Sequence, residues 1–182
     1  MCMGKYVAVI LLLAVLSGCA SNPIAQDLRK QAQPLTHTQV IANPKTTTGS
    51  IVIWGGRIIN LVNTNNGGEI YVLQLPLSRR SRPTSNDSAS SGRFIAVSPE
   101  FLDPVKYPGG SLITVAGQLN GVRNERLQSV YYRYPLLDIK QIYFWTKGTT
   151  DYYYNYESRS APVKKRLNLN LQSGTTGPKK IL

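Results

Sequence analysis

The chain has 182 residues, 42% of them hydrophobic, which is enough for one domain with a core and excludes a chain disordered by composition. Its 21 lysines and arginines exceed its 9 acidic residues and give a formal net charge of +12, so the expected partners are anionic. The two cysteines, Cys2 and Cys19, both lie near the amino terminus, and no disulfide is expected in the folded domain.

Residues 1–18 have the layout of a secretory signal peptide, with a basic start at Lys5 and an apolar run over residues 7–16. As a helix the apolar run would be about 15 Å long, at roughly 1.5 Å per residue. The hydrocarbon core of a bilayer is about 30 Å thick. The run is therefore too short for a stable transmembrane span, and we expect it to be removed on export.

The apolar run leads directly into Leu16-Ser17-Gly18-Cys19. This sequence resembles the lipobox of bacterial lipoproteins, which implies that Leu16, Ser17 and Gly18 are recognised by the signal peptidase and that the Cys19 thiol is lipidated. The following residue is alanine and not aspartate. By resemblance to lipoprotein sorting patterns, this implies the outer membrane. The predicted partner of the chain is thus the membrane, reached through lipid on Cys19.

Residues 19–48 show no strong periodicity, and we expect them to form a tether with one short helical turn near residues 24–33. His37, which is the one histidine of the chain, falls in this segment. A base of a catalytic triad must lie on the folded scaffold beside its nucleophile. We therefore interpret His37 as an exposed linker residue.

Residues 49–149 alternate between apolar and polar positions and carry regular turn signals, which predicts a mostly β domain. Asn65-Asn66-Gly67-Gly68 predicts a hairpin turn, and Gly55-Gly56 predicts a bulge or tight bend after the first strand. The pattern favours a small closed or partly open antiparallel barrel like the OB-fold. Seven short strands are expected, at residues 50–54, 57–64, 69–75, 94–97, 111–119, 130–134 and 140–146.

Two loops interrupt the predicted strands. Residues 78–92 are polar and serine-rich, so Arg79, Arg80 and Arg82 are expected on the surface. Residues 99–110 contain three prolines and predict a rigid connection, in which the Asp103 side chain caps a turn.

Residues 150–182 are tyrosine-rich and then basic, and we expect them to form a mobile or surface-draped tail. A second basic cluster lies there, at Lys164, Lys165 and Arg166.

A series of short motifs runs from residue 54 to residue 145: Trp54-Gly55-Gly56, Glu69-Ile70-Tyr71-Val72-Leu73-Gln74-Leu75-Pro76-Leu77, Ser91-Gly92-Arg93-Phe94, Phe101-Leu102-Asp103-Pro104, Tyr107, Thr114-Val115-Ala116-Gly117, Tyr132-Arg133-Tyr134-Pro135, Tyr143 and Trp145. In their order and spacing these motifs resemble the Slp family of outer-membrane lipoproteins, which is named for starvation induction. The resemblance implies outer-membrane attachment and a link to stress or stationary phase. It supplies no catalytic site or ligand, and it does not explain the basic tail.

The sequence predicts no catalytic residue, metal site or cofactor. Gly55-Gly56 lacks the Lys-Ser/Thr of a phosphate loop, and the lipidated Cys19 leaves no free thiol for catalysis. The first hypothesis is therefore a non-enzymatic envelope lipoprotein with a structural or interaction role. The second is a binding module for anionic envelope lipid or polysaccharide that uses the two basic clusters, with solvated surface charge as the plain alternative.

A third hypothesis, an envelope hydrolase, would need a pocket with paired carboxylates. The envelope location argues against nucleic acid as a partner. The oligomeric state is left open by the sequence.

Overall fold

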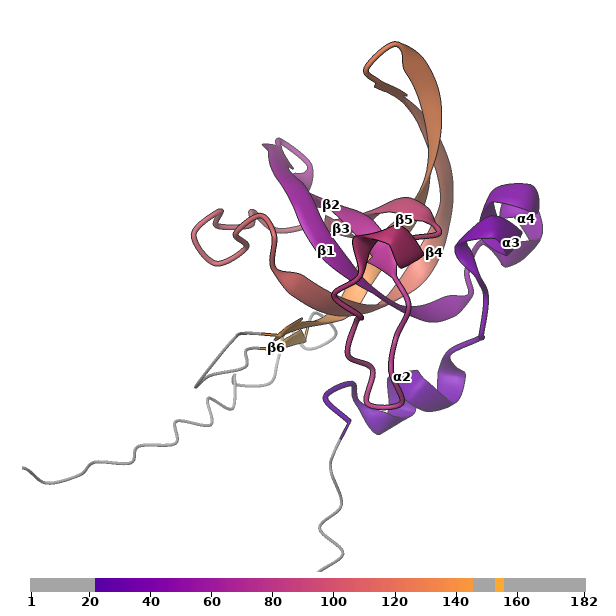
Figure 1. The fold of residues 1–182 in the computed structure, drawn as a ribbon, viewed down its shortest axis with the longest axis vertical. Helices are drawn as coiled ribbons and strands as arrows, with labels where there is room; N and C mark the ends of the chain where they lie inside the picture. The colour runs from indigo at the N-terminus through magenta and orange to yellow at the C-terminus, as the bar shows by residue number, and fades with distance from the viewer. Residues whose placement is uncertain (1–21, 146–152, 156–182) are drawn as a thin grey trace, which may run out of the picture.

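The computed structural model describes residues 22–145 and 153–155 (Figure 1). The predicted lipobox with Cys19, and the basic cluster at residues 164–166, lie outside the described residues. The elements in chain order are α2 (Gln26–Gln31), α3 (His37–Ala42), α4 (Pro44–Thr47), β1 (Ile51–Thr64), β2 (Gly67–Leu75), the 3-10 turn η1 (Asp87–Ala89), β3 (Gly92–Ser98), β4 (Leu112–Leu127), β5 (Val130–Trp145) and β6 (Tyr153–Asn155).

The strands form one sheet in the order β3-β2-β1-β4-β5-β6. All neighbours in this order are antiparallel, and a short parallel pairing of residues 95–97 of β3 with residues 136–138 of β5 closes the first five strands into a ring. The structure is thus mostly β with a five-stranded closed sheet of OB-like order, which confirms the predicted fold class. Closure satisfies the edges of β3 and β5 along the residues that pair.

The first strand is longer than predicted and runs without interruption through Gly55-Gly56. We expected a bulge at these glycines. The irregularity lies a few residues further along the strand, where the β1–β2 register shifts between Ile58 and Asn60. Gly56 is paired on both sides, and a Cβ there would overlap the Leu73 carbonyl oxygen. Gly56 therefore serves close backbone approach and not a turn.

The predicted hairpin turn at residues 65–68 is confirmed, with β1 and β2 joined at residues 65–66 and Gly67 at a positive φ of 122°. The later strands were predicted as fragments, but β4 and β5 have 16 residues each. Pro135 lies opposite Val122 at a register shift, where the ladder is already irregular, so it does not end the strand. The outer part of this β4–β5 hairpin projects from one end of the molecule (Figure 1).

The core fills the interior of the closed sheet. Phe94 is completely buried, and its ring meets the Trp54 ring edge-on at a centroid distance of 5.4 Å. The Trp54 indole N–H donates to the Leu35 carbonyl oxygen at 2.9 Å. Trp54 therefore packs in the core and joins the sheet to the segment that precedes it.

Residues 22–48 differ from the tether that we expected, because they form three short helices that lie against the sheet. Ile24 and Leu28 are buried beside Ala116, and Val40 belongs to the main core. The Ala25 N–H donates to the Gln141 side-chain oxygen at 2.9 Å. Several isolated apolar side chains thus dock this segment. The helical turn expected near residues 24–33 is confirmed by α2, whereas α3 and α4 were not predicted.

The interpretation of His37 as an exposed linker residue is wrong. His37 begins α3 and is only 7% exposed, and its Nε2 lies 3.0 Å from the Arg93 carbonyl oxygen. A carbonyl only accepts, so Nε2 carries the proton. Burial disfavours the charged ring and lowers the pKa of His37. The hydrogen bond to the Arg93 carbonyl raises this pKa, but the effect of burial is larger.

The free energy of unfolding is expected to decrease as the pH is lowered from about 7.5 to about 5.5. The folded-state pKa of His37 lies below its unfolded value, so the unfolded chain binds more protons in this window and is favoured by acid. His37 is the one histidine of the chain. A His37→Gln variant should therefore lose most of the slope in urea titrations across this range. An unchanged slope would contradict the assignment to His37.

Candidate binding cavity

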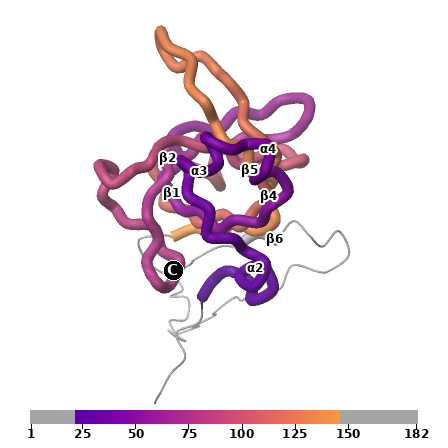
Figure 2. Tube along the Cα trace, turned by 90° about the vertical axis from the view of Figure 1, so that its right-hand side faces the viewer, coloured from indigo at the N-terminus to yellow at the C-terminus, as the bar shows by residue number. Residues whose placement is uncertain are grey.

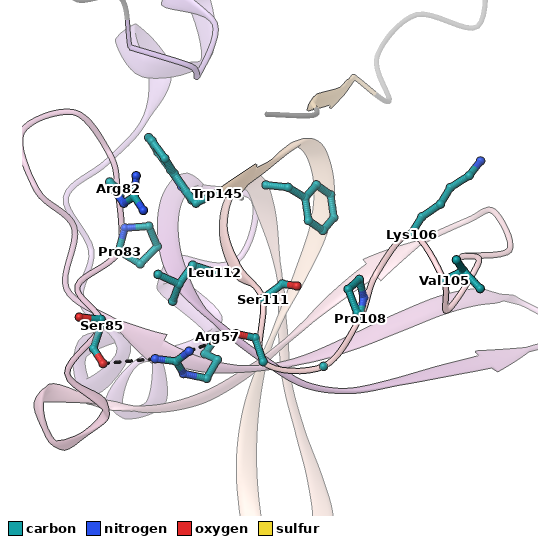
Figure 3. A pocket seen from close by; sticks show the side chains of 13 residues that line it. Arg57, Arg82, Pro83, Ser85, Val105, Lys106, Pro108, Ser111, Leu112 and Trp145 are labelled. Carbon is teal, nitrogen blue, oxygen red and sulfur yellow. Dashed lines mark hydrogen bonds between the residues drawn. The ribbon is translucent and has the colours of Figure 1, made fainter. Parts of the chain in front are cut away.

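A cavity of about 1010 Å³ that is open to solvent lies among the described residues (Figure 3). It lies between two loops, residues 76–91 and residues 99–111, and the adjoining ends of β4 and β5. This volume is at the upper end of the range for sites that bind small molecules. Its lining combines apolar and cationic side chains and consists of Arg57, Arg82, Pro83, Ser85, Val105, Lys106, Pro108, Gly109, Gly110, Ser111, Leu112, Phe144 and Trp145.

The first loop packs closely against β1 because Gly55 has no side chain. A Cβ at Gly55 would overlap the Leu77 side chain and come within 2.8 Å of the Pro83 ring. Leu77 and Pro83 also form a β-bridge that closes the base of the loop. Gly55, which the sequence suggested as a bend, thus positions the loop that carries the predicted arginine cluster.

Within this loop, Ser81 has a φ of 59°, in the left-handed region that non-glycine residues rarely adopt. It is held by the Thr114 hydroxyl, which donates to its carbonyl oxygen at 2.6 Å. The Trp145 indole N–H donates in turn to the Thr114 hydroxyl at 2.9 Å. These bonds fix the backbone next to Arg82, whose guanidinium lies 5.1 Å from the Trp145 ring centroid in a cation–π contact.

Arg57 links the two loops and is not available to a ligand. Its guanidinium donates to Asp87 at 2.9 Å, to the Ser85 carbonyl oxygen at 3.2 Å and to the Gly110 carbonyl oxygen at 3.1 Å. Ser85 and Asp87 belong to the first loop, and Gly110 belongs to the second. Arg57 therefore holds the two walls of the cavity at a set separation.

The second loop presents Lys106 and Val105, which is 85% exposed. The Asp103 carboxylate accepts from the Val105 N–H at 3.0 Å, so the predicted capping role of Asp103 is confirmed. Figure 3 shows Lys106 on one side of the cavity and Arg82, beside Trp145, on the other. Within residues 22–145 neither cation forms an ion pair. None of the described lining residues is acidic.

A second polar cluster lies on the outer faces of β2 and β4. Arg123 donates to both Glu69 oxygens at 2.9 and 2.7 Å, and its Nε lies 2.7 Å from Glu125, in an ion pair whose angle is poor for a hydrogen bond. The Tyr71 hydroxyl donates to Glu125 at 2.8 Å. The Arg123 guanidinium lowers the pKa of Glu69, chiefly by hydrogen bonding.

The charged groups of this second cluster are paired with one another. We therefore interpret the cluster as a structural contact between the β4–β5 hairpin and the sheet, and not as a ligand site. Nearby tyrosines are engaged as well: the Tyr132 hydroxyl accepts from the Arg93 N–H at 2.9 Å, and the Tyr134 ring packs against Tyr71. No group of three potential metal ligands occurs in the part of the chain that the structure describes.

The predicted arginine cluster is only partly brought to the cavity. Arg82 lines it, whereas Arg79 and Arg80 are exposed in the turn and do not belong to the lining. Sequence reasoning did not identify Lys106 or Trp145 as residues of a site. The one sequence signal for Lys106 was its position in an exposed, proline-rich loop. That position does not show that Lys106 lies across a cavity from Arg82.

Comparison with known proteins shows the family to which the chain belongs. The profile of the outer membrane lipoprotein Slp family matches residues 16–169, which include Cys19 and the whole closed sheet. The chain belongs to this family. The family resemblance and the outer-membrane localisation predicted from the sequence are thereby confirmed. Among the described residues, no helix is both long and apolar enough to cross a bilayer.

Relatives of this Slp-family chain have modest identity but good coverage. An uncharacterized protein of Haemophilus influenzae is 30% identical over 136 residues, which cover 74% of this chain and 73% of that protein. In Escherichia coli K12, the uncharacterized lipoprotein YeaY is 27% identical and covers 72% of this chain and 67% of its own, and the outer membrane protein Slp is 26% identical and covers 79% and 76%.

Among solved structures, a small single-stranded DNA-binding protein from Streptomyces coelicolor has 13% identity and a TM-score of 0.31, and the match covers 52% of this chain and 92% of that one. A TM-score this low supports no statement about function.

Proposed function

We propose that this outer-membrane lipoprotein is a non-enzymatic binding module that takes an anionic envelope ligand, a lipid or a polysaccharide, in the cavity beside Trp145. The observation that carries the proposal is the pair of cations, Arg82 and Lys106, that face an apolar wall without an acidic partner in the described residues. Cationic groups beside aromatic and aliphatic side chains suit ligands that carry phosphate or carboxylate on an apolar body.

The proposal includes attachment of the protein to the outer membrane through its amino terminus. The signal peptidase would recognise Leu16, Ser17 and Gly18, and the mature chain would begin at a lipidated Cys19. The basic clusters at Arg79 and Arg80, and at residues 164–166, would add long-range attraction to an anionic surface. A role in starvation or stationary phase is implied by the family resemblance, and we include it in the proposal on that ground alone.

Two alternatives receive less support. A hydrolase would need an acid–base pair or an activated nucleophile. The described lining holds Ser85 and Ser111 but no histidine, cysteine or carboxylate to activate them. A purely structural lipoprotein, with charge that only keeps it soluble, would not require two unpaired cations on opposite sides of one cavity.

Replacing Arg82 with alanine is expected to weaken binding of the delipidated chain to phosphatidylglycerol vesicles about fivefold, because one cation near an anionic surface contributes about 1 kcal/mol. Vesicle cosedimentation at increasing ionic strength measures this, and binding should weaken as salt rises. Arg133→Ala is the matched control, since Arg133 is also exposed but belongs to the β4–β5 hairpin. Equal losses in both variants would reject the cavity as the site.

A further inference from the structure

We infer that the ligand of the cavity is an intact phospholipid-type amphiphile from the leaflet that holds the protein, with its anionic headgroup at the rim that carries Arg82 and Lys106 and its acyl chain along the apolar wall. This inference rests on the proposed function and names the ligand class of the same site. It depends on the composition of the wall, on the distribution of charge and on the position of the cavity relative to the amino-terminal attachment.

The wall is apolar over a continuous part of the lining. Leu112 and Trp145 are partly exposed, Phe144 is buried, and Pro83 and Pro108 belong to the two loops on either side. Figure 3 shows Leu112 and Trp145 between the first loop and Ser111. A free phosphate or a sugar would leave these side chains in water, whereas an acyl chain would bury them at about 25 cal/mol per Å² of apolar surface.

The charges lie at the outer parts of the cavity. Arg82 and Lys106 are both exposed, and Arg57, deeper between the loops, is neutralised by Asp87 at 2.9 Å. An amphiphile with one anionic end matches this division, because its phosphate can stay hydrated at the rim while its chain leaves water. The Trp145 ring also carries the cation–π contact with Arg82, so the polar and apolar parts of the site meet at one residue.

The amino-terminal end of the described chain is bound directly beside this rim. The Asn22 amide donates to the Ser81 hydroxyl at 2.8 Å, and Ser81 is the neighbour of Arg82. The Gln141 amide donates to the Pro23 carbonyl oxygen at 3.1 Å, which fastens the same segment to β5. Cys19 precedes Asn22 by three residues, and three residues span at most roughly 11 Å.

Lipidation of Cys19 would therefore hold this end of the domain against the leaflet surface. Figures 1 and 2 both place α2 at the end of the molecule opposite the projecting β4–β5 hairpin. The cavity rim would face the lipid headgroups, and the hairpin would point away from them. A lipid of the same leaflet is thus the amphiphile that meets the cavity at the highest local concentration.

The two tryptophans of the chain allow a direct test. Trp145 lines the cavity, whereas Trp54 is 5% exposed in the core. The protein would be the chain from residue 19 onward, which contains every described residue, with Cys19→Ser so that the anchor does not impose contact. A Trp54→Phe variant leaves Trp145 as the reporter, and a Trp145→Phe variant leaves Trp54 as the matched control.

With vesicles of phosphatidylglycerol whose acyl chains carry bromine, we expect loss of Trp145 fluorescence and little change in Trp54 fluorescence. Brominated phosphatidylcholine vesicles should have little effect on either variant. A Ser111→Glu substitution in the lining should abolish the loss by repelling phosphate, whereas Ser129→Glu in the exposed β4–β5 turn should not.

The outcomes separate the two proposals. Salt-sensitive binding that depends on Arg82 but does not quench Trp145 would overturn the lipid inference and leave the anionic-ligand proposal standing. Displacement of the vesicles by inorganic phosphate at millimolar concentration would likewise overturn it, since the headgroup alone would then account for binding. Absence of binding to any anionic vesicle would overturn the lipid inference, and absence of binding to anionic vesicles and to anionic polysaccharide alike would overturn both proposals.

Discussion

Replacement of Cys19 with serine is expected to move the protein from the membrane fraction to the soluble fraction and to abolish its labelling by fatty acid. The lipobox would lose its only acylation site, because a hydroxyl does not replace the thiol in lipidation. Each buried CH₂ of an acyl chain contributes about 0.8 kcal/mol to anchoring, so the several chains of a lipoprotein make release negligible. Fractionation of cells grown with an alkyne-tagged fatty acid would measure both effects.

Cys2→Ser is the matched control, since Cys2 lies within the predicted signal peptide and would be absent from the mature chain. It should leave both partitioning and labelling unchanged. Retention of the Cys19→Ser protein in the membrane after a high-salt wash would contradict the anchoring proposal. Retention that salt reverses would instead be explained by the net charge of +12 acting on anionic lipid.

Replacement of Gly56 with alanine is expected to destabilise the domain by about 3 kcal/mol, at the upper end of the usual cost of overpacking. The new Cβ would overlap the Leu73 carbonyl oxygen and a methyl group of Val72. The oxygen belongs to the backbone of β2, which pairs with β1 at this position, so it cannot move without disturbing the ladder. Urea denaturation followed by circular dichroism would measure the loss.

Gly109→Ala provides the control for intrinsic effects of the substitution. A Cβ at Gly109 would meet nothing nearer than the Ile59 carbonyl oxygen, at 3.8 Å. This variant should remain within about 0.5 kcal/mol of the parent. Equal stabilities of the Gly56→Ala and Gly109→Ala proteins would show that β1 and β2 are not packed as closely as described.

The fold class could be predicted because strands and turns have local signals. Residues 65–68 form the expected hairpin turn, since asparagine and glycine accept the backbone angles that it needs. The lengths of β4 and β5 could not be predicted. Pro135 ends a strand by local rules, and only the register shift opposite Val122 makes it tolerable.

The packing of the segment before β1 was also not predicted from the sequence. Its few apolar side chains predicted only the helical turn near residues 24–33, which α2 confirms, and not α3 or α4. Ile24 and Val40 are nevertheless buried on a surface made by residues far along the chain. The burial of His37 follows from the same docking, because its hydrogen-bond acceptor, Arg93, is 56 residues away. Contacts at such separations leave no local pattern in the sequence.

The sequence by itself determined the family and the mostly β character of the domain, and it predicts the export signal with a candidate lipid site at Cys19. These properties depend on short stretches that a peptidase, or the backbone itself, reads locally. Only the tertiary structure decided that Arg82, Lys106 and Trp145 border one cavity and that Asn22 fastens the amino terminus to its rim. The physical reason is closure of the sheet, which brings together loops whose positions no linear pattern specifies.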